Sequence, residues 1–212
     1  MLTGTEKEKC TNNVENSCSW TQDITSGRIR TFKSGNAWRY GKIRVKAKLP
    51  AGPFFAPSIM MLPQDNVYGE WASSGEIDIM KAKGQVPGAV ESGIHFGGPW
   101  PNNAYAGDSF KFTNNNDFHV YGLDWDEDYI TFSVDEEFYG SIDLRTSFWT
   151  GKGSNPYTDI RQPFDEKFHL ILGVAIAGGS FESYGAFNYA RDTSQWTNPE
   201  MIVDYVRVYQ KK

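Results

Sequence analysis

The residues of this chain best suited to chemistry are two carboxylates in the segment Gly75–Met80, which reads GEIDIM. Side chains of a β-strand point alternately to its two faces, so Ile77 and Ile79 would face a core and Glu76 and Asp78 would lie side by side opposite them. Two adjacent carboxylates are suited to acid–base work on a bound ligand. The alternative is an ordinary solvated sheet face, the more frequent origin of an isolated Glu-x-Asp pattern.

Aromatic residues crowd the segments on either side of this carboxylate pair. Aromatic rings beside carboxylates on a concave sheet are what stacking against sugar rings requires. They therefore favour a carbohydrate-binding surface over a plain solvated face. The residues concerned are Trp71, His95, Phe96, Trp100 and Tyr105.

The elements that must position these residues are β-strands. Segments with period-two alternation recur throughout, bounded by turn residues, and no window places apolar residues at helical spacing over three turns. Many short strands without βαβ units predict an all-β fold with two antiparallel sheets packed face to face, a jelly roll or related sandwich. The segments read RIRTF, YGKIRVKAKL, GEIDIM, ESGIHF, FHVYGLDW, YITFSVD, EFYGSID, FHLILGVAI and MIVDYVRVY.

Two of these strands give more detail. In residues 41–49 apolar side chains alternate with Lys and Arg, so this strand should cover a core on one side and meet water on the other. Residues 168–176 are apolar on both faces, which predicts a strand in the interior of its sheet. Gly173 within it marks either a bulge or a close approach of a ligand to the backbone.

Length and charge set limits on the function. The 212 residues suit one domain, and 21 Lys and Arg against 26 Asp and Glu give a net charge of -5 without a basic run. Nucleic acid and anionic membranes are therefore not expected as partners. The longest apolar stretches, 54–62 and 170–177, are too short to span a bilayer. The segment 2–9 lacks the apolar core of a secretory signal, which could have been removed.

Two cysteines, Cys10 and Cys18, lie in the polar segment CTNNVENSC. This segment offers a thiol little burial, and the spacing is compatible with a short disulfide loop, which would indicate an oxidising compartment. The alternative is a pair of ordinary thiols in a strand connection.

Several blocks in order resemble glycoside hydrolase family 16, in particular its β-1,3-glucanase (laminarinase) branch and the related invertebrate β-1,3-glucan-binding proteins. The blocks are SGRIRT, YGKIRVKAKLP, MLPQDNVYG, WASSGEIDIM, HFGGPWPNN, FHVYGLDW, NPYTDIRQPFD and VDYVRVY. The resemblance covers nearly the whole chain. It implies a β-jelly-roll sandwich of the concanavalin A-like lectin and glucanase type, with the glucan in a cleft across a concave sheet.

The resemblance also implies roles for three residues. The family signature reads Glu, aliphatic, Asp, aliphatic, Met, Glu, and here the last position is Lys81. By position, Glu76 would be the nucleophile of a retaining mechanism, Asp78 its hydrogen-bonding partner, and Lys81 would occupy the acid/base position. Residues five apart on a regular strand face opposite sides, so a β-bulge must turn the last side chain toward Glu76.

Lys81 should impair hydrolysis. An amine with a pKa near 10.4 is a poor general acid at neutral pH, and the neighbouring carboxylates stabilise its charged form further. Loss of general acid catalysis costs on the order of 10²- to 10⁴-fold. An ammonium about 5 Å from an oxocarbenium-like transition state, at an effective dielectric of 20, adds roughly 3 kcal/mol of repulsion.

Two further positions depart from the family pattern. Where the family has Trp-Pro-Ala-x-Trp before the acidic strand, this chain has residues 56–60, APSIM, so two indoles are lost. Where the family has an Asn before Val-Ala, this chain has Gly173. Family members also carry strands upstream of this start. We therefore expect a single family 16-like domain over 1–212 that lacks those N-terminal strands and leaves a sheet edge open.

The resemblance assigns substrate contacts to residues that each have a structural alternative. Trp71 and His95 match cleft-lining residues, against simple packing, and Trp100 and Asn102 share the HFGGPWPNN block. Arg28 belongs to the basic strand of the family, against an exposed pair with surface carboxylates. We expect no cofactor and no metal, because no His/Cys cluster has zinc spacing. The structural calcium of the family uses the position of Asp204 together with ligands from the upstream region.

These observations predict a β-1,3-glucan-binding protein in which hydrolysis is weak or absent. The alternative is an active retaining endo-β-1,3-glucanase in which Lys81 is tolerated or another acid, such as Glu70 or Glu91, replaces it. A chain that folds poorly and does neither is a third possibility. We expect a monomeric, secreted protein with a polysaccharide or oligosaccharide partner. Immune sensing and digestion both remain open.

Overall fold

The computed structural model describes residues 25–84, 86–112, 117–176, 194 and 196–211, and the backbone of two short paired strands, β1 (Lys7–Lys9) and β2 (Ser19–Thr21). The expected Cys10–Cys18 disulfide lies outside the described residues. All of the regular elements in the described part are β-strands. No described segment forms a helix with the length and apolarity needed to span a membrane.

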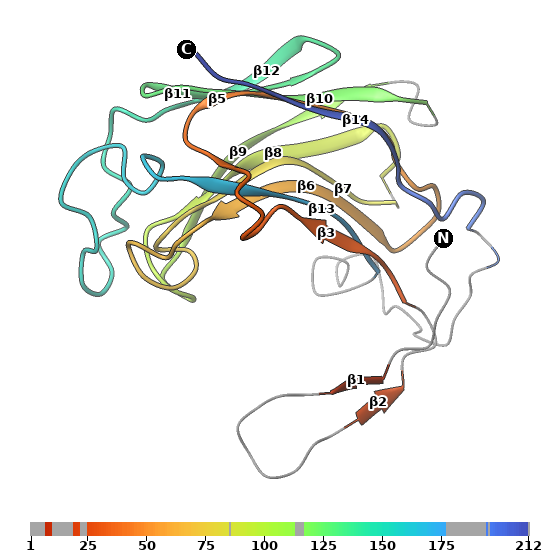
Figure 1. Cartoon of the computed structure of the whole chain (residues 1–212), viewed down its shortest axis with the longest axis horizontal. Helices are drawn as coiled ribbons and strands as arrows, with labels where there is room; N and C mark the ends of the chain where they lie inside the picture. Colours follow the sequence, from red (N-terminus) through yellow and green to blue (C-terminus); the bar gives the residue numbers. More distant parts are fainter. Residues whose placement is uncertain are drawn as a thin grey trace.

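One layer of the molecule is a five-stranded antiparallel sheet with the order β12-β11-β10-β5-β14 (Figure 1). Its strands are β5 (Gly41–Lys48), β10 (His119–Trp125), β11 (Tyr129–Val134), β12 (Glu137–Asp143) and β14 (Ile202–Tyr209).

The second layer is a seven-stranded antiparallel sheet with the order β3-β13-β6-β7-β8-β9, in which β4 also pairs with β13. Figure 1 shows this layer packed beneath the first. Its strands are β3 (Arg28–Arg30), β4 (Ala37–Trp38), β6 (Phe55–Pro63), β7 (Glu76–Ala82), β8 (Ala89–Phe96), β9 (Ala104–Lys111) and β13 (Phe168–Ile176). The predicted all-β fold of two antiparallel sheets is confirmed.

The core lies between the two sheets and is made by the inward residues of each strand. The alternation predicted for residues 41–49 is confirmed, because Ile43, Val45 and Ala47 are buried and the intervening Lys and Arg are not. Opposite them, Ile59 and Met61 of β6 and the aliphatic residues of β7 fill the inner face of the second sheet.

Strand β13 is an interior strand, as predicted, because it pairs with β3 and β4 on one side and with β6 on the other. Its register with β6 runs without a shift from Phe168 to Ile176. The bulge considered for Gly173 is therefore wrong. The stem of Arg28 lies over this glycine instead, with Cγ 3.4 Å from where a Cβ would stand.

A register shift in β7 brings its polar residues to one face. On β8, Gly93 lies opposite Asp78 and Glu91 lies opposite Lys81, so two residues of β7 between them share a single position on β8. Those two residues, Ile79 and Met80, are both buried in the core. The predicted bulge is confirmed, and it directs Lys81 to the same side as Asp78.

At one end of the sandwich, β3 and β14 are the outermost strands of their sheets, each paired on one side only within the described chain. Their apolar residues are only partly covered, with Ile29 67% exposed and Val206 40% exposed. Val206 lies opposite the buried Val45, so it faces the core side of its sheet. Apolar side chains at this edge of the described sandwich are thus partly open to solvent.

Candidate functional site

The candidate site is a charged trio, Glu76, Asp78 and Lys81, on the face of the seven-stranded sheet that is turned away from the core. We call this the solvent face. The Lys81 ammonium lies 2.6 Å from Asp78 Oδ2 and 3.1 Å from Glu76 Oε1. The side chain of Asp78 is fully buried and that of Glu76 is 9% exposed, whereas Lys81 keeps 35% of its surface. The amine predicted to stand beside the nucleophile position therefore contacts both carboxylates.

The pKa shifts in the trio separate its two carboxyl groups. Burial raises the pKa of Glu76 above its usual value, and the negative charge of Asp78 adds to this effect. Burial also opposes ionisation of Asp78, but the hydrogen bond from His95 and the charge of Lys81 outweigh it and hold the Asp78 pKa low. Burial opposes the charge on Lys81 as well, yet the two carboxylates raise its pKa. Asp78 and Lys81 thus form the ion pair, and Glu76 is the group that takes up a proton first.

Trp71 contacts Glu76, the residue at the nucleophile position, directly. Its indole Nε1 donates a hydrogen bond of 2.6 Å to Glu76 Oε2. Since Glu76 Oε1 meets Lys81, both oxygens of this carboxylate have a partner. The Trp71 ring remains 38% exposed, so it can also present a surface to a ligand. Its side chain is brought to the trio by the tight turn that precedes β7, in which Ser73 N–H bonds to Glu70 O and Gly75 N–H to Ala72 O.

His95 lies directly opposite Glu76 on β8. Its Nε2 is 3.4 Å from Asp78 Oδ2, so the imidazole borders the trio. Its ring packs at 5.4 Å from the ring of Trp71 and at 4.8 Å from that of Tyr105. Three aromatic rings therefore stand in series beside the carboxylates.

The buried hydroxyl of Tyr157 joins the two loops that border the site. It donates to Ser73 O at 2.8 Å, in the turn before β7, and accepts from Gly97 N–H at 3.0 Å, at the end of β8. Burial raises the Tyr157 pKa to about 12, so the group stays a neutral hydroxyl that can serve both contacts. No sequence pattern singles out this residue, because the two loops it joins are far from it in the chain.

The two other residues named from the HFGGPWPNN block, Trp100 and Asn102, have different surroundings. Trp100 is 74% exposed. Its backbone N–H donates to the backbone carbonyl of Trp71, so it lies next to Trp71 at the edge of the site. The Asn102 side-chain amide nitrogen lies near Gly153, 3.9 Å from where a Cβ would stand, and the Asn102 backbone carbonyl accepts a hydrogen bond from the Thr150 hydroxyl. Its backbone N–H donates to Pro99 O at 2.8 Å, so the contacts given for Asn102 are with its own turn and with the loop at 150–153.

Arg28 is on the solvent face but apart from the trio. The register places Arg28, Gly173, Ser58 and Lys81 in one transverse row across four strands. At a strand spacing of about 4.8 Å, Arg28 is roughly 14 Å from Lys81. No carboxylate in the described ranges pairs with it. Arg28 is thus on the same face as the trio and three strands away from Lys81.

The two acids considered as substitutes for the missing Glu lie in different places. Glu91 is opposite Lys81 on β8, is 53% exposed and pairs with Lys83 at 3.3 Å. Glu70 is exposed in the turn before β7, where its backbone carbonyl accepts the hydrogen bond from Ser73. Of the two, Glu91 is the one whose strand register places it directly opposite a member of the trio.

One cluster in the described chain could offer three ligand atoms to a metal ion: Glu76, Asp78 and His95, with those atoms within 4.8 Å of one another. The Lys81 ammonium already contacts both carboxylates of this cluster, so a cation is provided by the chain itself. The family calcium position fits poorly too, because the Asp204 carboxylate pairs with Lys46 at 2.8 Å.

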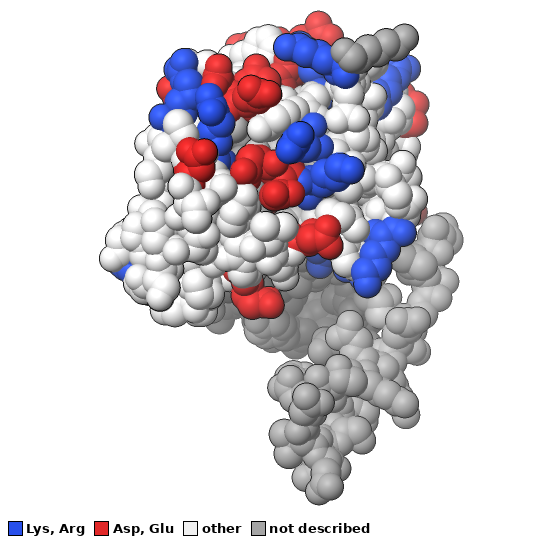
Figure 2. Space-filling view, turned by 60° about the vertical axis from the view of Figure 1, so that its left-hand side comes forward, with Lys and Arg blue, Asp and Glu red and all other residues white. Residues whose placement is uncertain are grey.

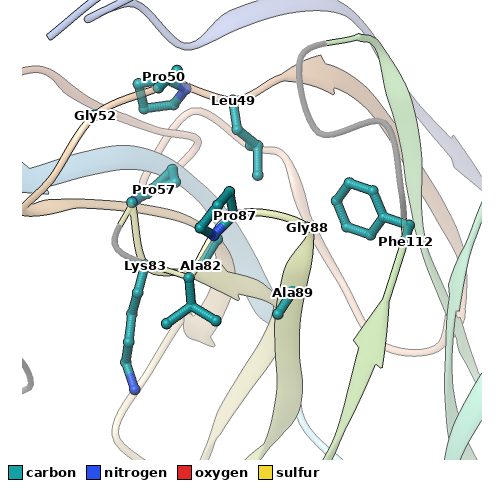
Figure 3. Close-up of a pocket in the computed structure, with 13 residues that line it drawn as sticks. Leu49, Pro50, Gly52, Pro57, Ala82, Lys83, Pro87, Gly88, Ala89 and Phe112 are labelled. Carbon is teal, nitrogen blue, oxygen red and sulfur yellow. The ribbon is translucent and has the colours of Figure 1, made fainter. Parts of the chain in front are cut away.

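A separate hollow of about 350 Å³ lies where the end of β5, the β7–β8 turn and the end of β9 meet (Figure 3). Its lining is mainly apolar, including Leu49, Pro87 and Phe112, and the Lys83 side chain points away from it. The described residues that line it include no carboxylate or imidazole. On the face seen in Figure 2, charged side chains of both signs are interspersed beside a broad uncharged area.

Fold and site together define a protein of the family 16 type, in which a β-sandwich carries a Glu-x-Asp strand on its open face. The family model for "Glycosyl hydrolases family 16" matches residues 3–158. The chain belongs to this family.

The relatives include both enzymes and binding proteins. The chain is 42% identical to glucan endo-1,3-beta-glucosidase A1 of Niallia circulans, over 89% of the chain and 26% of that protein. It is 35% identical to a beta-1,3-glucan-binding protein of Penaeus monodon, over 97% of the chain and 60% of that protein. The chain thus spans less than two thirds of either relative.

Among solved structures, the laminarinase of Rhodothermus marinus superposes with a TM-score of 0.71 at 30% identity, covering 94% of this chain and 74% of that one. The expected jelly-roll fold of this family is thereby confirmed.

Proposed function

We propose that this chain binds β-1,3-glucan across the solvent face of its seven-stranded sheet and hydrolyses it weakly or not at all. The observation that carries the proposal is the position of Lys81, whose ammonium contacts Glu76 at 3.1 Å and Asp78 at 2.6 Å. In the family pattern, the acid/base Glu stands at this position.

The chemistry of a retaining glycosidase explains why this exchange would stop turnover. The leaving sugar oxygen needs a proton from a group that titrates near working pH. The pKa of Lys81 is raised by its two carboxylate partners, so its proton is held too tightly for this task. The same ammonium would stand beside the positive charge that develops at the anomeric carbon and would raise the barrier further.

The nucleophile position is also restrained. An attack by Glu76 requires an ionised carboxylate with an oxygen available to the anomeric carbon. Here Trp71 and Lys81 each hold one oxygen, and burial favours the protonated form. Glu76 is therefore better suited to hydrogen bonding with sugar hydroxyls than to covalent attack.

Glucan binding requires neither a general acid nor an available nucleophile. Trp71 and Trp100 are exposed beside the trio, and His95 lies between Trp71 and Tyr105. Aromatic faces next to hydrogen-bonding polar groups form the usual pattern of a sugar site. Arg28 would contact the glucan farther along the sheet. We extend the proposal to an extracellular protein that recognises glucan, supported by the relatives named glucan-binding proteins.

The test measures binding and cleavage in the same sample. Laminaripentaose is titrated calorimetrically into the whole chain, and the recovered solution is then analysed for shorter oligosaccharides. Saturable binding with the pentaose intact after prolonged incubation is the expected result. Rapid conversion to shorter products would refute the proposal, and so would a lack of binding.

A second candidate function is endo-β-1,3-glucan hydrolysis with Glu91 as the acid. It is favoured by the position of Glu91 opposite Lys81 and by its 53% exposure. If the native chain cleaves laminarin and Glu91→Gln abolishes the cleavage without loss of binding, this candidate replaces the first. Glu137→Gln is the matched control, because Glu137 is exposed on β12 of the other sheet.

A further inference from the structure

A second feature of the solvent face concerns Tyr105, on β9. It lies directly opposite His95, and its side chain is 47% exposed. Its hydroxyl donates to Ser92 O at 3.2 Å. The ring therefore leans back along the sheet from its own strand position toward β8.

Beneath this ring lies a pair of glycines. Gly93 and Gly107 face each other across β8 and β9, and Gly93 is also opposite Asp78. A Cβ at Gly93 would come within 2.6 Å of the Tyr105 hydroxyl, and one at Gly107 within 2.4 Å of it. A Cβ at either position would collide with the ring and also with a backbone oxygen of the facing strand, Ala106 O or Ser92 O. The glycine pair therefore makes a flat surface on which the ring lies.

This arrangement leaves one face of the Tyr105 ring accessible to a ligand. Since one side of the ring rests on the glycines, the exposed 47% belongs to its edges and to the side turned toward solvent. The ring also packs against His95 at 4.8 Å, and His95 packs against Trp71. On the other side of the trio, Ser58 of β6 lies opposite Lys81 and Met60 lies opposite Asp78. Neither of these two described positions carries an aromatic ring.

We propose that Tyr105 is a sugar-stacking residue, which extends the Trp71–His95 platform across β9 and holds the glucan on the β8–β9 side of the trio. This inference rests on the proposed glucan-binding function. It also names the ligand class: β-linked glucose residues have equatorial substituents, so their faces carry only axial C–H bonds that can lie flat on the ring. A sugar with an axial hydroxyl on that face would stack poorly.

The test compares Tyr105→Ala with Tyr129→Ala, a control on β11 of the other sheet with a 38% exposed ring. Loss of one stacking ring should weaken laminaritetraose binding about five- to tenfold, whereas Tyr129→Ala should bind as the native chain does. Thermal melts without ligand check that each variant folds.

A second measurement in the native chain covers the case in which Tyr105→Ala fails to fold. With ¹³C-labelled tyrosine, the Tyr105 ring signals, assigned by their loss in Tyr105→Phe, should shift on addition of laminaritetraose while those of Tyr129 do not. Native binding with an unchanged Tyr105→Ala affinity, or with unshifted Tyr105 signals, would overturn this inference alone. A native chain that binds no glucan would overturn the proposed function with it.

Discussion

The Lys81 ammonium lies 2.6 Å from Oδ2 of Asp78, a side chain with no exposed surface. This contact links the chemistry of the site to the stability of the fold. A buried carboxylate without a counter-charge is costly, so Lys81 supports the structure while it occupies the position of the acid.

Lys81→Met should therefore destabilise the protein. Breaking a buried ion pair costs about 3–5 kcal/mol, and partial exposure of Lys81 to solvent reduces this to about 2–3 kcal/mol. Urea unfolding at pH 7 measures the loss. Lys46→Met is the matched control, because its pair with Asp204 is at the surface, and its unfolding midpoint should stay near the native one. Equal midpoints for the two variants would contradict the assigned pairing.

The raised pKa of Glu76 predicts a pH dependence of stability. The folded state binds this proton more tightly than the unfolded state, so the Glu76 contribution is fully present below the ordinary glutamate pKa of 4.5 and is lost as pH rises through the higher pKa of the folded state. The native chain should accordingly lose stability relative to Glu76→Gln as pH rises from 4.5. Urea midpoints over this range test it, with the exposed Glu137→Gln as control. A native chain that gains stability relative to Glu76→Gln over the same window would contradict the shift.

Tyr157→Phe should loosen the two loops beside the site. It removes hydrogen bonds to Ser73 O and from Gly97 N–H and leaves two buried backbone groups unpaired, at about 1–3 kcal/mol each before any local relaxation. Glucan affinity should fall as well, although Tyr157 does not contact the trio. Hydrogen exchange at Gly97 N–H provides the local measurement. Unchanged protection of this amide would argue against the linking role.

Much of the fold and the centre of the site followed from the sequence, because strand alternation and charge pattern are local. The side-by-side carboxylates and the bulge that brings Lys81 to them were predicted from GEIDIM and the family spacing. Strand β6 was not found from periodicity, since its sequence FAPSIMMLP includes two prolines. Strand β9 was missed because AYAGDSFK has few residues that favour strands.

The contacts that position the site could not be read from the chain. The Trp71–Glu76 hydrogen bond depends on how a tight turn aims one indole, and the flat surface under Tyr105 requires knowing that Gly93 and Gly107 pair. Asn102 shares its sequence block with His95, yet its side chain faces another loop. Such details depend on register and loop packing, which sequence patterns do not specify.

The most direct test of the role of Lys81 is laminarin hydrolysis by Lys81→Glu, which restores a carboxyl group at the acid/base position. Release of reducing ends should rise by about 10²- to 10⁴-fold over the native chain, as expected for the return of general acid catalysis, while the Kd for laminaritetraose stays close to the native value. The double variant Lys81→Glu with Glu76→Gln should show no gain, because it lacks the nucleophile. A native chain that already hydrolyses laminarin as fast as Lys81→Glu would contradict the central role of Lys81.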